Sequence, residues 1–245
     1  MKVFLKIVCF LLISIGIIFT SITVMEKEPQ NTEKITLKTQ YPRRGNKQDI
    51  PEEIKRVMNG ISMPEGATVR YDDLSYLTIY HYDFEGKVTT GHMVVDKTLA
   101  DEVLDIFAEL YDLEYPIERM DLIDYYNDLQ TDILDSLDNA SMGYNNTSSF
   151  CYRTISGTST MSYHAYGRAI DVNPKINPYV VVKSGRVSPR NAYQYRTREN
   201  IFSDVENRAL IRHGDPVYNV FKKYSWDWGG DWKNVKDYQH FEKKF

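Results

Sequence analysis

The sequence predicts a single α+β domain with a small, mainly antiparallel sheet flanked by helices. Residues 71–96 alternate apolar and polar side chains on either side of Glu85-Gly86, which is typical of a β-hairpin. Residues 98–115 then carry apolar side chains at helical spacing. From residue 141 onward, short apolar runs are separated by Gly, Pro and Asn, which indicates short strands and loops. No internal repeat is evident, so one domain accounts for this pattern.

The remaining elements follow in chain order. A short helix is predicted at 52–58, and a strand or turn running into a helix at 118–138. A further helix is predicted from about 207 to 223. Gly214 and Pro216 interrupt it, and a new helix is expected to start there.

Residues 1–25 are predicted to be a signal peptide or a membrane anchor. Lys2 and Lys6 precede an apolar run over residues 7–24, whose length is at the lower limit for a membrane span. Because no Ala-x-Ala-like cleavage pattern follows, an uncleaved anchor is slightly favoured. In either case the rest of the chain is expected to be exported, either secreted or held on the outer face of the membrane.

Residues 26–60 are polar and contain three prolines, so they are predicted to form a tether before a domain at 61–245. Cys151 is the only cysteine in that domain, so no internal disulfide is expected there. The net charge of −4 disfavours nucleic acid as the main partner. A monomer is expected.

Two motifs carry the chemistry: Ser162-x-His164 with Asp171 seven residues beyond the histidine, and Asp237-x-x-His240-x-Glu242 near the C-terminus. Two histidines and an acid are the ligands of a catalytic zinc site, and a spare carboxylate can accept a proton from water. On a straight helix, residues seven apart lie about 10 Å apart along the axis, which is too far for one ion. A turn at Gly167 followed by a strand is therefore predicted.

In a strand, His240 and Glu242 share one face while Phe241 points toward the core. Glu242 can then orient the His240 ring through its second nitrogen. Asp237 is the better candidate for the general base, because a base and a ligand can approach each other through one water.

The C-terminal part resembles the VanY-like zinc D-Ala-D-Ala carboxypeptidase and L-alanyl-D-glutamate peptidase family, the peptidase M15 type. The resemblance covers roughly residues 65–245. The matching segments are Ser141-Met142, Asn145 to Ser148, Phe150 to Arg153, Ser162 to Asp171, Asn173-Pro174, Asn177 to Tyr179, Trp226 to Trp232 and Asp237 to Glu242.

The resemblance implies a hedgehog/DD-peptidase-like fold, a Zn²⁺ cofactor and peptidoglycan stem peptides as substrate. By resemblance, His164, Asp171 and His240 are the metal ligands and Asp237 is the catalytic acid. Arg153 matches the arginine that meets the scissile carbonyl, and its fixed charge suits that role.

Other substrate contacts are less specific. Ser162 is predicted to bind substrate or to hold the loop before His164. Trp228 and Trp232 flank a Gly-Gly turn and are predicted to form a substrate wall or to pack in the core. The arginines of the segment 186–198 can supply a carboxylate clamp or a solvated basic face: Arg186, Arg190, Arg196 and Arg198.

D-Ala-D-Ala carboxypeptidase activity is preferred, with L-Ala-D-Glu endopeptidase activity as the alternative within the family. Two rivals belong to other classes. One is a cysteine peptidase that uses Cys151, although it leaves Asp171 and Asp237 without a clear role. The other is a non-catalytic wall-binding module with structural zinc.

Overall fold

The computed structural model describes residues 42–199 and 202–245. It is mixed α+β with small antiparallel sheets, so the predicted fold class is confirmed. The proposed anchor at 1–25 lies outside the described residues. Within the described part, no helix combines the length and apolar character that a membrane crossing requires.

The first sheet contains β1 (Asn46–Gln48), β2 (Leu74–Tyr82) and β3 (Val88–Asp96), in that order and antiparallel. The predicted hairpin is confirmed. Its turn is closed by Asp83, whose Oδ1 accepts hydrogen bonds from the backbone N–H groups of Glu85 and Lys87, both at 2.9 Å. This sheet is the platform on which the first long helix packs.

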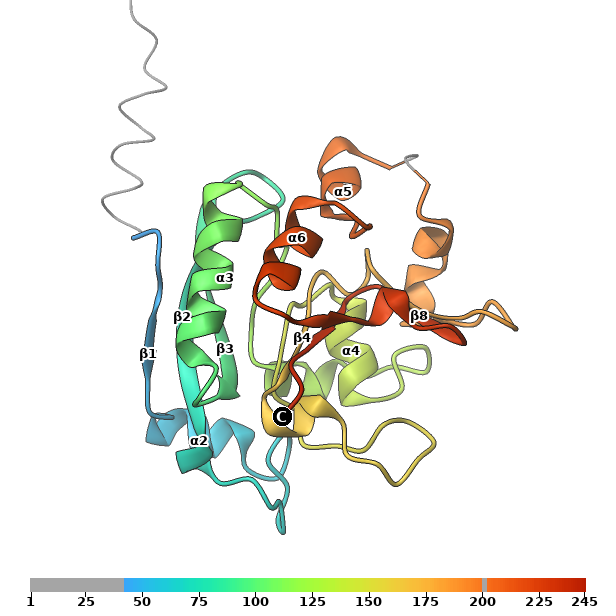
Figure 1. The fold of residues 1–245 in the computed structure, drawn as a ribbon. Coiled ribbons are helices and arrows are strands. Elements are labelled where there is room, and N and C mark those ends of the chain that lie inside the picture. The colour runs from blue at the N-terminus through green and yellow to red at the C-terminus, as the bar shows by residue number, and fades with distance from the viewer. Residues whose placement is uncertain (1–41, 200–201) are drawn as a thin grey trace, which may run out of the picture.

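Helix α3 (Ala100–Asp112) lies along β2 and β3 (Figure 1) and buries one side at the predicted spacing. Val103, Ile106 and Phe107 are almost fully covered, because apolar residues three and four apart share one helix face. The helix predicted from the sequence is therefore confirmed.

The end of the predicted tether contributes to this layer. Helix α2 (Glu52–Met58) forms where it was predicted and buries Ile54 and Met58. Strand β1 extends the hairpin by pairing with β2, and α2 packs in one cluster with Leu74 and Tyr76 of β2. The predicted boundary at residue 60 therefore follows two elements that pack on the domain.

Two further sheets, each with three short antiparallel strands, form the other side of the molecule. One has the order β4-β9-β7 and the other the order β6-β5-β8. Their bounds are β4 (Ala169–Asp171), β5 (Tyr179–Val181), β6 (Val187–Ser188), β7 (Asp227–Trp228), β8 (Val235–Asp237) and β9 (His240–Glu242).

The remaining elements are short helices: η1 (Tyr71–Asp73), η2 (Ile123–Leu129), α4 (Leu137–Gly143), η3 (Tyr163–Tyr166), η4 (Arg190–Thr197), α5 (Asp204–Ala209), α6 (Pro216–Lys223) and η5 (Gly229–Asp231). The predicted interruption of the late helix is confirmed, since α5 ends before Gly214 and α6 starts afresh with Pro216 in its first turn. Proline suits that position because its nitrogen needs no partner there.

One hydrophobic core joins the two sides. Phe241 of β9 stacks on Phe221 of α6 with ring centroids 4.0 Å apart, and the same cluster reaches Phe107 of α3. Strand β9, which carries His240, is thus fixed directly to the main core.

Candidate active site

His164, Asp171 and His240 converge in one buried cluster, each from a different element. His164 Nε2 lies 3.1 Å from His240 Nδ1 and 3.3 Å from Asp171 Oδ2, and His240 Nδ1 lies 3.1 Å from Asp171 Oδ1. Two ligand atoms on a tetrahedral zinc ion lie about 3.3 Å apart. The observed spacing fits one such ion with three protein ligands.

Sheet register brings the two distant halves together. Asp171 of β4 lies directly opposite His240 of β9 in the antiparallel ladder, and side chains opposite each other in such a ladder lie about 5 Å apart at Cβ. Phe241 points into the core, as predicted from the alternation. Residues 69 positions apart therefore meet through strand pairing.

His164 reaches the cluster through the predicted turn. Helix η3 ends at Gly167, which has a left-handed backbone with φ 66°, and β4 begins two residues later. A Cβ at Gly167 would lie 2.4 Å from the backbone nitrogen of Asp96. Both the turn and the close approach to β3 therefore require glycine.

Each histidine ring is oriented by a hydrogen bond on its far side. His164 Nδ1–H donates to the backbone oxygen of Ser149 at 2.6 Å, and His240 Nε2–H donates to Glu242 Oε2 at 3.1 Å. When each ring is neutral, the nitrogen that faces the cluster therefore carries a lone pair, which is the tautomer that binds a metal. Glu242 lies where the sequence placed it.

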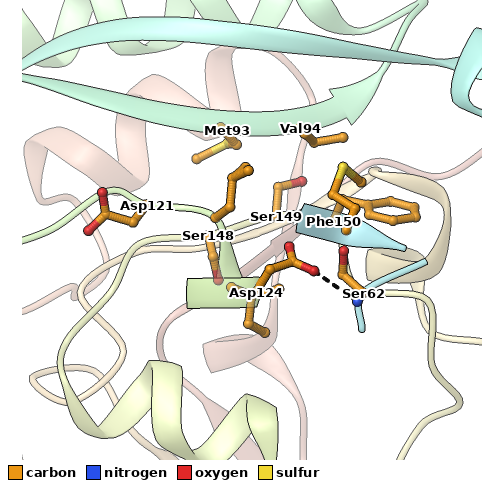
Figure 2. A pocket seen from close by; sticks show the side chains of 11 residues that line it. Ser62, Met93, Val94, Asp121, Asp124, Ser148, Ser149 and Phe150 are labelled. Atoms are coloured by element: carbon orange, nitrogen blue, oxygen red, sulfur yellow. Dashed lines mark hydrogen bonds between the residues drawn. The ribbon is translucent and has the colours of Figure 1, made fainter. Parts of the chain in front are cut away.

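The Ser149 carbonyl was not foreseen from the sequence. Ser148 exchanges two backbone hydrogen bonds with Asp171, and Ser149 Oγ donates to the Ala169 oxygen at 2.7 Å. Figure 2 shows this segment beneath β3, beside a small cavity where Asp124 accepts a hydrogen bond from Ser62. The segment 148–150 is therefore fixed between β3 and β4.

The charges of the cluster favour a cation. Burial alone would raise the pKa of Asp171, but the charges and hydrogen bonds of His164 and His240 outweigh it and hold that pKa well below its usual range. Burial lowers the pKa of His240, yet hydrogen bonds to Asp171 and Glu242 raise it to about 10. The cluster thus attracts either a proton or a metal ion, and a divalent ion would replace the proton.

Asp237, at the end of β8, lines the same cleft. Its Oδ1 is covered and has no hydrogen-bond partner in the described part of the chain. Burial raises its pKa to about 7, and the negative charges of Asp171 and Asp138 add to the shift while His240 opposes it. A carboxylate with such a pKa is suited to accept and return a proton near neutral pH.

Arg153 also lines the cleft. Its Nη2 donates to Asp138 Oδ1 at 3.0 Å, while its Nε is buried without a partner among the described residues. Burial lowers the pKa of Arg153, but the charge of Asp138 outweighs it, so the pKa rises and the guanidinium stays charged. Asp138 was missed because nothing in the sequence links it to Arg153.

These residues surround a cleft of about 610 Å³. Ser162 lies on its wall and also accepts a hydrogen bond from the backbone N–H of His164 at 3.3 Å, so it holds the loop as well. Trp232 lies on the wall with its ring centroid 5.3 Å from that of His240. Both therefore lie within reach of a ligand.

Trp228 takes the other of its two predicted places, in the core and not on the wall of the cleft. It is 3% exposed and packs in the main core, and its Nε1–H donates to the Tyr238 oxygen at 2.9 Å. Its ring lies over Gly230, where a Cβ would be 2.3 Å from the indole. The glycine lets the indole fold inward, away from the cleft.

Cys151 is buried, and burial raises the pKa of its thiol to about 12. It is not among the residues that line the cleft. A nucleophilic cysteine needs an accessible thiolate, so the position of Cys151 argues against a cysteine peptidase.

The four arginines of the segment 186–198 divide into two kinds. Arg186 and Arg190 line the cleft. Arg198 is partly buried and donates to backbone oxygens of Ile176 and Ile211, while Arg196 stacks on the exposed ring of Tyr193. Only the first pair is placed to contact a ligand in the cleft.

A comparison with protein families matches residues 156–243 to the family described as D-alanyl-D-alanine carboxypeptidase. The matched stretch contains His164, Asp171, His240 and Asp237, and Arg153 lies just before it. Comparisons with curated proteins and with solved structures returned no match. The match supports a peptidase, and over residues 156–243 it agrees with the resemblance to the peptidase M15 family drawn from the sequence.

Proposed function

We propose that the protein is a zinc-dependent peptidase that hydrolyses the stem peptides of peptidoglycan. The observation that carries the proposal is the cluster of His164, Asp171 and His240, whose donor atoms lie 3.1 to 3.3 Å apart. Two nitrogens and one carboxylate oxygen form a ligand set typical of catalytic zinc. A bound zinc ion would polarise the scissile carbonyl and lower the pKa of its water to about 7.

The protein's own residues perform the remaining tasks. Asp237 holds a carboxylate beside the cluster that accepts the proton of the attacking water and returns it to the leaving amine. Arg153, kept in place by Asp138, meets the negative charge that develops on the carbonyl oxygen. Trp232 and Ser162 bound the space in which the peptide lies.

Carboxypeptidase activity is favoured over endopeptidase activity by Arg186 and Arg190 on the cleft wall. Arg190 has one acidic neighbour, Asp135 at 3.7 Å, and Arg186 has no ion pair within the described ranges. A guanidinium that lacks a carboxylate partner can bind the free carboxylate of a terminal D-Ala.

We also propose that the domain acts outside the cell membrane, anchored or secreted through residues 7–24. The support is the apolar run after Lys2 and Lys6, together with a substrate that lies outside the membrane.

Defined stem peptides ending in D-Ala-D-Ala, as free acid and as C-terminal amide, test these proposals. The protein without residues 1–25, supplied with zinc, should release D-Ala from the free-acid peptide. Mass spectrometry of the products identifies the bond that is cut. A chelator should stop the reaction. The variant Asp237→Ala should keep zinc and lose hydrolysis. Cleavage between L-Ala and D-Glu would identify the endopeptidase, and zinc binding without cleavage of any stem peptide would favour the wall-binding module.

A further inference from the structure

Gln239 is a buried amide in the wall of the cleft, in the kink between β8 and β9. It is 3% exposed and lines the cleft next to Asp237 and His240. Its backbone oxygen accepts a hydrogen bond from Val172 at 3.0 Å, so its main chain is fixed against the strand end after Asp171. The side chain is therefore held in a defined place beside the metal cluster.

The carboxamide of Gln239 lacks normal partners. Its Nε2 lies 3.0 Å from the sulfur of Met142, which is only a weak acceptor. Its Oε1 is covered and has no hydrogen-bond partner in the described part. Rotating the amide by half a turn would set the oxygen against the sulfur, two acceptors in contact. The orientation with a free oxygen is therefore the better one, and this oxygen needs a donor.

Several buried polar atoms that lack a hydrogen-bond partner belong to residues of this cleft. Of the eight buried side-chain atoms without a partner in the described ranges, three belong to residues that line it: Arg153 Nε, Asp237 Oδ1 and Gln239 Oε1. Buried polar groups are normally paired, so exceptions call for an explanation. Arg153 and Asp237 have roles in the proposed chemistry, whereas Gln239 has none so far.

We propose that Gln239 is a substrate-binding residue whose Oε1 accepts a hydrogen bond from a backbone N–H of the peptide next to the scissile bond. A peptide presents N–H donors and C=O acceptors, and only the donor complements this oxygen. The contact fixes the register of the peptide relative to the metal cluster and selects peptides over esters. This inference rests on the proposed peptidase function.

The variant Gln239→Met tests the proposal, because methionine is similar in length and carries no hydrogen-bonding oxygen. We expect kcat/KM for a stem peptide to fall about tenfold, since a site built around a hydrogen bond loses affinity when the bond is missing. The unfolding midpoint should stay unchanged or rise, because an unpaired buried acceptor has been removed. Gln130→Met, at an exposed glutamine outside the cleft, is the control and should keep full activity.

Substrate analogues locate the bond without relying on a variant. In a set of peptides, each backbone N–H is replaced in turn by an ester oxygen, leaving the scissile amide intact. For one analogue, the kcat/KM of the parent protein should be about tenfold lower than for the all-amide peptide. With Gln239→Met, the same replacement should not lower kcat/KM any further. The proposal is overturned if no ester replacement lowers kcat/KM with the parent protein. It is also overturned if Gln239→Met lowers stability while kcat/KM is kept.

Calorimetric binding of the same peptides separates this proposal from the proposed function. If the parent protein cleaves no stem peptide, the peptidase proposal fails. Weaker binding of one ester analogue to the parent, but not to Gln239→Met, would still support the role of Gln239. Conversely, normal cleavage with no effect of the variant or the analogues would reject Gln239 alone.

Discussion

Gly167 offers a quantitative test of how the site is built, through the substitution Gly167→Ala. Its φ of +66° costs a residue with a Cβ about 1–2 kcal/mol. The new Cβ would also lie 2.4 Å from the Asp96 nitrogen and 2.7 Å from the Val95 carbonyl carbon. Both are backbone atoms of β3, so no side chain can move aside, and forced shifts of this kind cost about 1–3 kcal/mol. The expected loss in the free energy of unfolding is therefore about 2–5 kcal/mol.

Gly157→Ala provides the matched control. Gly157 has φ +76°, and nothing lies within 4 Å of the position that a Cβ would take there. The free energy of unfolding of Gly157→Ala should therefore fall only by the cost of the left-handed backbone, about 1–2 kcal/mol. Urea unfolding of both variants and the parent, with the m-values compared, measures the difference. If both variants lost the same free energy of unfolding, the close approach of Gly167 to β3 would not constrain the structure.

A second readout connects this test to the site. Gly167 lies between the proposed ligands His164 and Asp171, and its oxygen accepts a hydrogen bond from the Asp96 nitrogen at 2.9 Å. A shift of the turn moves His164 relative to Asp171. Zinc affinity should therefore fall in Gly167→Ala and remain at the parent level in Gly157→Ala, as measured by competition with a chromophoric chelator.

The remaining predictions concern the metal cluster and its neighbours. Glu242→Gln should lower zinc affinity about 10- to 100-fold, because the ring of His240 loses its carboxylate acceptor; unchanged affinity would remove Glu242 from that role. Cys151→Ser should keep peptidase activity with zinc present, and loss of activity in a well-folded variant would revive the cysteine mechanism. The kcat/KM should rise with pH, and the midpoint of the rise should lie at or below about pH 7, because Asp237 must be ionised, its pKa is about 7 in the metal-free cleft, and a bound dication lowers that pKa. A profile that is flat down to pH 4 would contradict Asp237 as the base.

Local patterns were sufficient for much of the fold. The alternation on either side of Glu85-Gly86 and the spacing in α3 each depend on residues close in the chain, where periodicity records which face is buried. The Gly167 turn was also foreseen, because the ligand geometry excluded a straight helix between His164 and Asp171.

The contacts that were missed are long-range and carry no residue signature. Any residue can offer the carbonyl by which Ser149 orients His164. Asp138 meets Arg153 only because α4 places it there. Trp228 and Trp232 were equivalent in sequence, yet the first folds over Gly230 into the core and the second faces the cleft. Such choices are decided by packing in three dimensions rather than by spacing.

The core itself sets the geometry of the proposed metal cluster. Ile170 and Phe241 are opposite each other in the β4–β9 ladder and both are fully buried. A slip of β9 by one residue would turn Phe241 toward the other face of the sheet, and it would also separate Asp171 from His240. The hydrophobic contacts that hold Phe241 on Phe221 therefore keep two of the three proposed ligands in register. Because this register depends on apolar burial, the domain should fold before the metal binds, and zinc should add stability to an already formed site.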